Sequence, residues 1–363
     1  MTSRIGLGRI GLGIIGTGRW ADAHARATAR SDQVAIVDCF SPTPDKRSAF
    51  ASRHGIERVS ESIEDLLADD RVEAVIVSSP NDNHADHVAQ AVAAGKPALV
   101  DKPVAVNMAE GLELLRSVAG AAPFGVAHHA RRLAGHRAAR EWIESGRAGA
   151  VRIAHADFSN ARGAHLAPDA WHRTAGGSEG GVLIQVGIHP IENLLYLLGP
   201  PTSVNARFAY ETLGPNMPDA AVAIITHIGG AISTVSSSWT TPGHYVLDLQ
   251  ATAGNLEYRL DHTQWTSGDV DDFGILTLDQ PEAPRRRLDV VKGDPLREQV
   301  EELGRSARLR TPMEVGVIEG LRAMAVVEAA VGSAAREGEP VHMTRLWSEA
   351  GATAEEVAAF LAV

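Results

Sequence analysis

The chain has very few cysteines and lysines, and each scarcity excludes a class of protein. Cys39 is the only cysteine among 363 residues, so no disulfide can form within the chain, which suits a reducing compartment. Lysine occurs only four times, and the formal net charge is −11. This acidic balance argues against nucleic acids and anionic membranes as partners, because both select basic patches.

Long hydrophobic runs are also missing. No segment has the length of a membrane-spanning helix, and the N-terminal region lacks the apolar run of a signal peptide. The composition is that of a globular protein, with 44% hydrophobic residues and a mean hydropathy of −0.07. A chain of this length can form two domains. We therefore expect a cytoplasmic protein of two domains.

Glycine, by contrast, is abundant near the N-terminus, where two dinucleotide-binding patterns overlap. Gly-x-Gly-x-x-Gly fits residues 11–16, and a variant that ends in alanine fits residues 16–21. The apolar run 9–15 predicts a strand that is followed by a helix, so the tight turn falls at 16–18. We predict that the second pattern binds a pyrophosphate, with a ligand-free glycine-rich turn as the alternative. The predicted cofactor-binding residues of this turn are Gly16, Thr17, Gly18, Arg19 and Trp20.

Strand-like and helix-like runs alternate through the first third of the chain. Further strand-like runs occur at 34–40, 73–80, 97–103 and 123–129, with helical runs between them. This alternation predicts an α/β fold, namely a doubly wound parallel sheet of the Rossmann type, which binds ligands at the carboxyl ends of its strands. We assign a dinucleotide-binding Rossmann domain to residues 1–126.

The region 127–363 has a different pattern. A helical run at 134–145 is followed by short β-like runs with turn residues between them, and then by helical runs at 313–337 and 348–363. This order predicts an antiparallel sheet that is combined with helices. β-branched residues at alternate positions would suit a sheet face that a partner subunit covers.

The end of the second predicted strand suggests which residue reads the ribose of the cofactor. Asp38 has a suitable spacing from the glycines, but the strand continues to Phe40 and leaves Asp38 short of its end. Ser41 stands at the end, with Lys46 and Arg47 nearby in sequence. Serine does not repel a 2′-phosphate and the cations attract one, so we predict NADP, with NAD as the alternative. In the other interpretation, Lys46 and Arg47 are a solvated helix start.

Three segments, in order, resemble the Gfo/Idh/MocA family, the oxidoreductases that include glucose-fructose oxidoreductase and inositol dehydrogenase. They read GIIGTGRWA at 13–21, PNDNHADHVAQAVAAGKPALVDKPVA at 80–105 and GGVLIQVGIHPIENLLYLLG at 180–199. The resemblance covers nearly the whole chain. It implies that residues 127–363 form a substrate-binding α+β domain, whose open, mostly antiparallel sheet joins the subunits of a homodimer or homotetramer. It also implies that Lys102 and His189 are catalytic. Further cofactor-binding residues that it implies are Pro80, Asn81, His84, Asp101 and Lys102.

The chain departs from the family pattern at two positions. Asp101 replaces the glutamate before the catalytic lysine, a change of one methylene that we expect to be tolerated. Gln185 replaces the aspartate four residues before His189, which removes a negative charge from the catalytic group. We expect the Gln185 side chain to accept a hydrogen bond from the imidazole and to fix its tautomer.

The chemistry of alcohol oxidation suits these residues. A histidine exchanges protons near neutral pH, and a lysine ammonium stabilises charge on the reacting oxygen. If 182–198 is one helix, Gln185 and His189 share a face. Pro190 disfavours helical geometry at His189, so the alternative is a helix that starts at Pro190, whose N-terminus would lower the pKa of His189. In the alternative, non-catalytic interpretations, Lys102 is a surface cation and His189 is a structural histidine.

Other histidines form two groups along the chain, His128, His129 and His136, and His155, His165 and His172. They lack the ligand spacing of a metal site, so we predict no metal. The predicted substrate-binding residues are His129, Arg131, Trp171, His172 and His189.

We therefore predict an NAD(P)-dependent dehydrogenase or reductase that acts on a hydroxyl or keto carbon of a sugar, polyol or related cyclic compound. Two alternatives stay open. Some relatives cleave glycosides through transient oxidation by a retained NAD, and a non-catalytic dinucleotide sensor could have the same fold.

Overall fold

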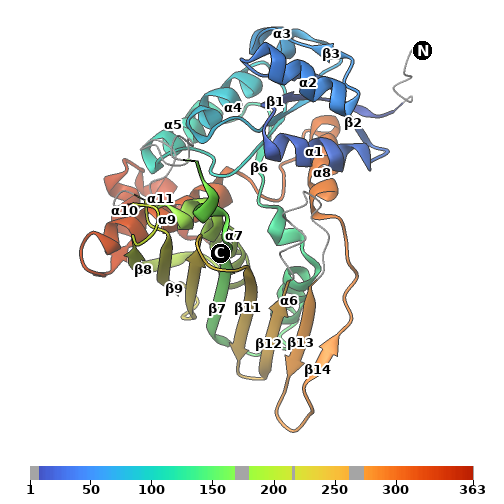
Figure 1. Cartoon of the computed structure of the whole chain (residues 1–363). Helices are drawn as coiled ribbons and strands as arrows, with labels where there is room; N and C mark the ends of the chain where they lie inside the picture. The colour runs from blue at the N-terminus through green and yellow to red at the C-terminus, as the bar shows by residue number, and fades with distance from the viewer. Residues whose placement is uncertain (1–7, 168–179, 215–216, 261–273, 363) are drawn as a thin grey trace.

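The first half of the chain forms a parallel sheet flanked by helices. In the computed structural model, which describes residues 8–167, 180–214, 217–260 and 274–362, six strands have the order β3-β2-β1-β4-β5-β6. Their bounds are β1 Ile10–Ile15, β2 Val34–Phe40, β3 Arg58–Val59, β4 Ala74–Val77, β5 Ala98–Val100 and β6 Phe124–Val126. The helices are α1 Arg19–Ala29, α2 Pro44–His54, α3 Ile63–Ala68, α4 His84–Ala93 and α5 Met108–Ser117. The predicted Rossmann architecture is confirmed (Figure 1).

The glycines of β1 serve packing within this sheet. A Cβ at Gly11 would lie 1.9 Å from the Arg71 carbonyl oxygen, and one at Gly13 would lie 2.7 Å from a Leu66 methyl. Both residues lie inside the strand, as the sequence predicted for the first glycine pattern. Their small size lets the neighbouring chain segments approach the sheet closely.

The second half forms a nine-stranded sheet in the order β14-β13-β12-β11-β7-β10-β9-β8-β15. Neighbouring strands are antiparallel except for the parallel pair β7 and β10, so the predicted mostly antiparallel sheet is confirmed. The strand bounds are β7 Val151–Ser159, β8 Pro201–Ala209, β9 Ala220–His227, β10 Ile232–Ser238, β11 His244–Ala251, β12 Gly254–Arg259, β13 Ile275–Asp279, β14 Arg286–Leu288 and β15 Val341–His342.

Helices pack on one face of this second sheet. They include α6 (Ala134–Glu144), α7 (Ile188–Leu198) and α9 (Val317–Ala334). Alternate strand residues point to opposite faces, and the residues facing the helices are buried. On β7, β9, β10 and β13, large apolar side chains outside this core are 42–50% exposed. They are Ile153, Val222, Ile224, Ile232 and Ile275.

The C-terminal region joins the two sheets. α8 (Pro295–Leu309) returns to the first sheet and packs on α1 and β1, where a Cβ at Gly304 would lie 2.4 Å from a Val34 methyl. The sequence pattern changes at 126/127, but the later helix α8 packs against the first sheet, so this position does not divide the structure into two separate parts. The single helix predicted over 348–363 was wrong: α10 (Met343–Glu349) and α11 (Ala354–Leu361) are separated at Gly351, whose φ is +91°.

Candidate active site

The carboxyl ends of β1, β4, β5 and β6 meet at one edge of the first sheet. The amide of Ser78 donates to the Ile15 carbonyl, that of Asp101 to the Val77 carbonyl and that of Ala127 to the Val100 carbonyl. The strand order reverses between β1 and β4, and in doubly wound sheets ligands bind at such a switch point.

The turn after β1 has the geometry that a dinucleotide needs. Gly16 has a φ of +109°, and a Cβ there would lie 2.2 Å from the Ser78 carbonyl oxygen. Gly18 is the N-cap of α1, and no atom lies within 4 Å of the position that its Cβ would take. The helix start therefore directs its first backbone N–H groups toward an open space, which fits a pyrophosphate. Thr17 lies in this turn, and Arg19 and Trp20 open the helix.

The residues at the end of β2 lie where the sequence placed them. Asp38 is fully buried and accepts hydrogen bonds from Arg58 and from the backbone and hydroxyl of Ser60. Its carboxylate is therefore engaged inside the domain. Ser41 follows the strand, and its carbonyl accepts a 3.1 Å hydrogen bond from the Arg47 guanidinium. Lys46 is exposed on α2.

Lys102 follows β5, and its ammonium reaches the second domain. Its Nζ donates to the main-chain carbonyl of Gln185 at 2.7 Å, a contact that any residue at 185 could accept. Burial, and less strongly the charge of Arg162, lower the pKa of Lys102 to about 8 against the opposing charge of Asp101. Nζ also donates to the Ile184 carbonyl at 3.5 Å, and because an ammonium has three donors, one N–H remains for a substrate oxygen.

Asp101 precedes Lys102 in the chain and is the negatively charged side chain next to it. It accepts a 2.9 Å hydrogen bond from His24 on α1 and a short one from the Ser78 hydroxyl. Burial raises the pKa of Asp101, but His24 and Ser78 outweigh this effect and the pKa is lowered. Asp101 therefore stays ionised and connects α1, β4 and β5.

His84 joins the loops after β4 and β5. It is buried, with Nδ1 at 2.6 Å from the Pro103 carbonyl and Nε2 at 2.9 Å from the Ser79 carbonyl. These contacts hold the loop that carries Lys102, so the ring positions the lysine. Of its predicted companions, Asn81 is buried and Pro80 is exposed.

His189 lies in a continuous helical segment, so the single helix is confirmed and the alternative start at Pro190 is wrong. A π-helical turn, η6 (Leu183–Gly187), runs directly into α7, which begins at Ile188. Proline lacks the N–H that would bond to the carbonyl four residues back, and the wider π turn lies just before it. The pKa of His189 is well below its usual value because of burial, Lys102 and the neighbouring histidines.

Three imidazoles pack together at this point. The ring centre of His189 lies 5.2 Å from that of His129 and 6.3 Å from that of His128, and Trp20 contacts His129 at 5.2 Å. Burial, the largest cause, together with cationic neighbours lowers the pKa of His129 to about 3. These histidines are therefore neutral at physiological pH.

Arg131 is engaged elsewhere. Its guanidinium forms a buried ion pair with Glu192 of α7, with Nε at 2.7 Å from Oε1, and it lies over the Tyr196 ring. This pairing holds η2 (His129–Arg132) on α7, and the substrate contact of Arg131 stays a prediction. Trp171 and His172 lie outside the described residues.

Four site residues were absent from the predicted set: His24, Ser78, His128 and Arg162. Ser78 and His128 follow strands of the first sheet, and this position was the available signal. His24 lies on α1, and Arg162 lies in η3 (Arg162–His165) after β7. No sequence pattern marks either residue.

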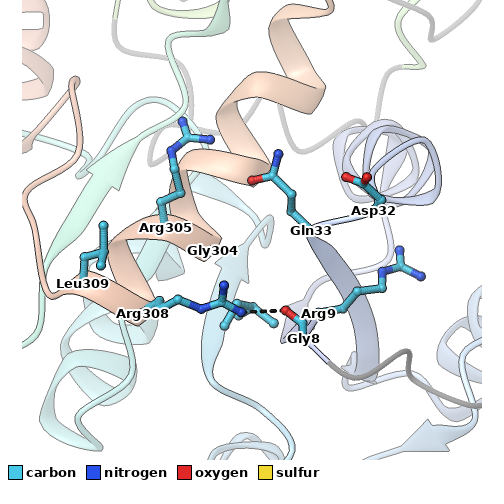
Figure 2. A pocket seen from close by; sticks show the side chains of 9 residues that line it. Gly8, Arg9, Asp32, Gln33, Gly304, Arg305, Arg308 and Leu309 are labelled. Atoms are coloured by element: carbon cyan, nitrogen blue, oxygen red, sulfur yellow. Dashed lines mark hydrogen bonds between the residues drawn. The ribbon is translucent and has the colours of Figure 1, made fainter.

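A separate cavity of about 530 Å³ lies at the opposite edge of the first sheet (Figure 2). It is bounded by the start of β1 and the C-terminal end of α8, and Arg308 donates to the Gly8 carbonyl across it. In the described part of the chain, no group of three or more His, Cys, Asp or Glu residues has metal-binding geometry. Among the same residues, no helix is long and apolar enough to cross a bilayer.

Comparison with known proteins covers both halves of the chain. The profile of the oxidoreductase family with an NAD-binding Rossmann fold, GFO_IDH_MocA, matches residues 10–123, and that of the GFO/IDH/MocA C-terminal domain matches 136–275. The crystal structure of a Desulfitobacterium hafniense protein, assigned as an NADPH-dependent oxidoreductase, is similar with a TM-score of 0.88 and 31% identity, over 94% of this chain and 99% of that one.

Proteins of known activity are more distant in sequence. The 1,5-anhydro-D-fructose reductase of Ensifer adhaerens is 28% identical over 69% of this chain and 75% of its own length. The scyllo-inositol 2-dehydrogenase (NAD(+)) of Bacillus subtilis strain 168 is 27% identical over 72% of this chain and 78% of its own. The family predicted from the sequence is confirmed: this protein belongs to the Gfo/Idh/MocA family of NAD(P)-dependent oxidoreductases.

Proposed function

We propose that the chain is a dehydrogenase or reductase that interconverts a hydroxyl and a keto carbon of a sugar, polyol or related cyclic compound. The observation that carries this proposal is the convergence of Lys102, from the end of β5, on the turn before His189 in the second domain. Relatives that reduce anhydrofructose or oxidise scyllo-inositol support the same substrate class.

In this proposal Lys102 and His189 divide the chemistry. The nicotinamide, when bound, accepts or supplies the hydride. His189 is neutral, so it can take the hydroxyl proton during oxidation and return it during reduction. The Lys102 ammonium donates to the same oxygen and stabilises its developing negative charge. Gln185 holds that ammonium through its main-chain carbonyl, and His84 holds the loop behind it.

For the cofactor, the proposal favours NADP over NAD. The Arg47 guanidinium lies at the Ser41 carbonyl, and the nearest strand carboxylate, Asp38, is buried and paired. A 2′-phosphate at this position would meet a cation and no free carboxylate. The Desulfitobacterium hafniense relative, assigned to NADPH, is consistent with this choice. A Ser41→Asp variant should bind NADPH at least tenfold more weakly, with NADH binding changed much less.

The second sheet supports a homodimer or homotetramer. Its helix-free face presents five large apolar side chains, led by Val222 at 50% exposure. Exposed apolar patches on soluble proteins mark interaction surfaces. Light scattering of the wild type and of a Val222→Lys, Ile224→Lys variant would test this proposal, since the variant should dissociate. A cytoplasmic location is part of the proposal and rests on the single buried cysteine.

The test is turnover of a panel of sugars and cyclic polyols with NADP and NAD, before and after extensive dialysis. Reduction of added cofactor supports the proposal. Turnover of glycosides by a cofactor that dialysis does not remove would instead identify the NAD-dependent hydrolase. Cofactor binding without turnover of any panel member would identify a sensor.

A further inference from the structure

A buried imidazole without a hydrogen-bond partner stands beside the proposed catalytic pair. His128 is 1% exposed, and neither of its ring nitrogens has a partner among the described residues. By contrast, His136, eight residues further on, has Nδ1 at 2.7 Å from the Ala130 carbonyl and Nε2 at 3.3 Å from the Tyr245 hydroxyl. Folded proteins satisfy most buried polar groups, because an unsatisfied one costs free energy.

The position of His128 connects it with substrate rather than with the dinucleotide. It follows β6, the edge strand farthest from the glycine turn after β1, with β4 and β5 in between. Its ring centre lies 6.3 Å from that of His189, with the two planes at 79°. Hydrogen bonds to imidazole nitrogens lie in the ring plane, so the two rings suit different oxygen atoms of one bound molecule.

The hydrogen-bonding chemistry of a neutral imidazole indicates which substrate group would pair with His128. Burial, with Arg131 and Lys102 nearby, keeps His128 uncharged. A neutral imidazole has one donor and one acceptor nitrogen, and a hydroxyl group can satisfy either. A hydroxyl can therefore pair with whichever nitrogen faces the substrate, whereas a carboxylate or phosphate can pair only with the donor nitrogen.

We propose that His128 binds a second hydroxyl of the substrate, on the carbon next to the one that His189 and Lys102 act on. The substrate class is therefore a vicinal diol and the matching α-hydroxy ketone. This inference rests on the proposed function and deepens it, because it assigns a specificity-determining residue to a site that otherwise recognises only the reacting oxygen.

The experiment compares each substrate with its analogue in wild-type and variant enzymes. We would measure kcat/KM for scyllo-inositol, or for whichever cyclic polyol in the panel reacts fastest, and for its deoxy analogue lacking the neighbouring hydroxyl. The variants are His128→Phe, which removes both nitrogens, and His128→Gln, which keeps a donor and an acceptor. His136→Phe is the matched control, since it removes a buried imidazole of the same segment whose nitrogens have partners.

We expect the wild-type kcat/KM to be roughly 10- to 100-fold higher for the diol than for its deoxy analogue. This is the usual effect of losing a hydrogen bond when the loss leaves a buried polar group unpaired. His128→Phe should remove this preference by slowing only the diol, and His128→Gln should restore part of it. His128→Phe should also keep or raise Tm, because it replaces an unsatisfied polar group by an apolar one. Dissociation constants for NADH and NADPH should stay unchanged.

Three results would overturn the inference. Equal slowing of diol and deoxy analogue by His128→Phe would show that the ring does not read the second hydroxyl. Weaker cofactor binding in that variant would assign His128 to the dinucleotide. Loss of the diol preference in His136→Phe as well would show a nonspecific effect. If the wild type oxidises no polyol at all, the proposed function itself fails, and this outcome is distinct from the other three.

Discussion

The lowered pKa of Lys102 predicts how activity depends on pH. In the proposed oxidation, the ammonium form of Lys102 stabilises the negative charge that develops on the substrate oxygen, so kcat/KM should fall about tenfold for each pH unit above a limb near 8, where the free-enzyme pKa lies. On the acid side, His189 is already the neutral base, which predicts that no limb occurs near pH 6.5. A profile of polyol oxidation recorded at constant ionic strength with a fixed substrate would show both features.

Replacing Arg162 by glutamine tests the cause of this pKa. Its positive charge disfavours the Lys102 ammonium, so removal should move the basic limb to higher pH. Burial is the larger cause, so the movement should be less than about one pH unit, or about 1.4 kcal/mol. Arg152→Gln, which removes an exposed arginine from the start of β7, is the control and should leave the limb in place.

The result that would refute this reasoning is a limb that stays fixed or moves to lower pH in Arg162→Gln. A wild-type profile without any limb near pH 8 would refute it more broadly.

The same pKa makes a prediction about stability. Folding lowers the pKa of Lys102 from 10.5, so the charged lysine destabilises the fold at pH 7 by at most about 3 kcal/mol. That cost should disappear as pH rises from 8 to 10.5, and Lys102→Met should raise Tm at pH 7.

The remaining predictions concern the turn, the base and the buried ion pair. Gly16→Ala should lower the free energy of unfolding by about 2 kcal/mol or more in a denaturant titration, because its Cβ meets the Ser78 carbonyl at a positive φ. Gly18→Ala should unfold normally but bind cofactor at least tenfold more weakly, measured by fluorescence titration. His189→Asn should lower kcat by roughly 10²- to 10⁴-fold with cofactor affinity unchanged, and a smaller loss would remove it from the chemistry. Glu192→Ala should destabilise the fold by roughly 3–5 kcal/mol, since it strands a buried arginine charge; a change below 1 kcal/mol would contradict a buried, charged pair.

The fold could be predicted because its signals are local. Apart from the two-residue β3, each strand of the first sheet is a short apolar run, and most of the turns contain glycine, proline or serine. The strand glycines could be separated from the turn glycines because only Gly16 and Gly18 lie between a strand and a helix. The break at Gly351 was missed because the flanking residues favour helix on both sides.

The place of a candidate site residue could be predicted from the chain pattern where the residue follows a strand, whereas His189 on α7 was identified through the family resemblance. Lys102 was placed correctly at the sheet edge for this reason. The pairing of Arg131 with Glu192 joins residues 61 positions apart, and no local pattern indicates it. The same is true of His24 with Asp101, and of the missing partners of His128, because satisfaction of a buried group depends on the whole packed structure.

The most direct test of the central claim is a comparison of wild type and Lys102→Met with the polyol panel, followed at the nicotinamide absorbance band. Cofactor binding is measured on the same samples. The account predicts wild-type turnover, and a variant that still binds cofactor yet reacts at least 10²-fold more slowly when cofactor is saturating. A variant that turns over substrate as fast as the wild type would contradict the assignment of Lys102 to the reacting oxygen, and with it the proposed site.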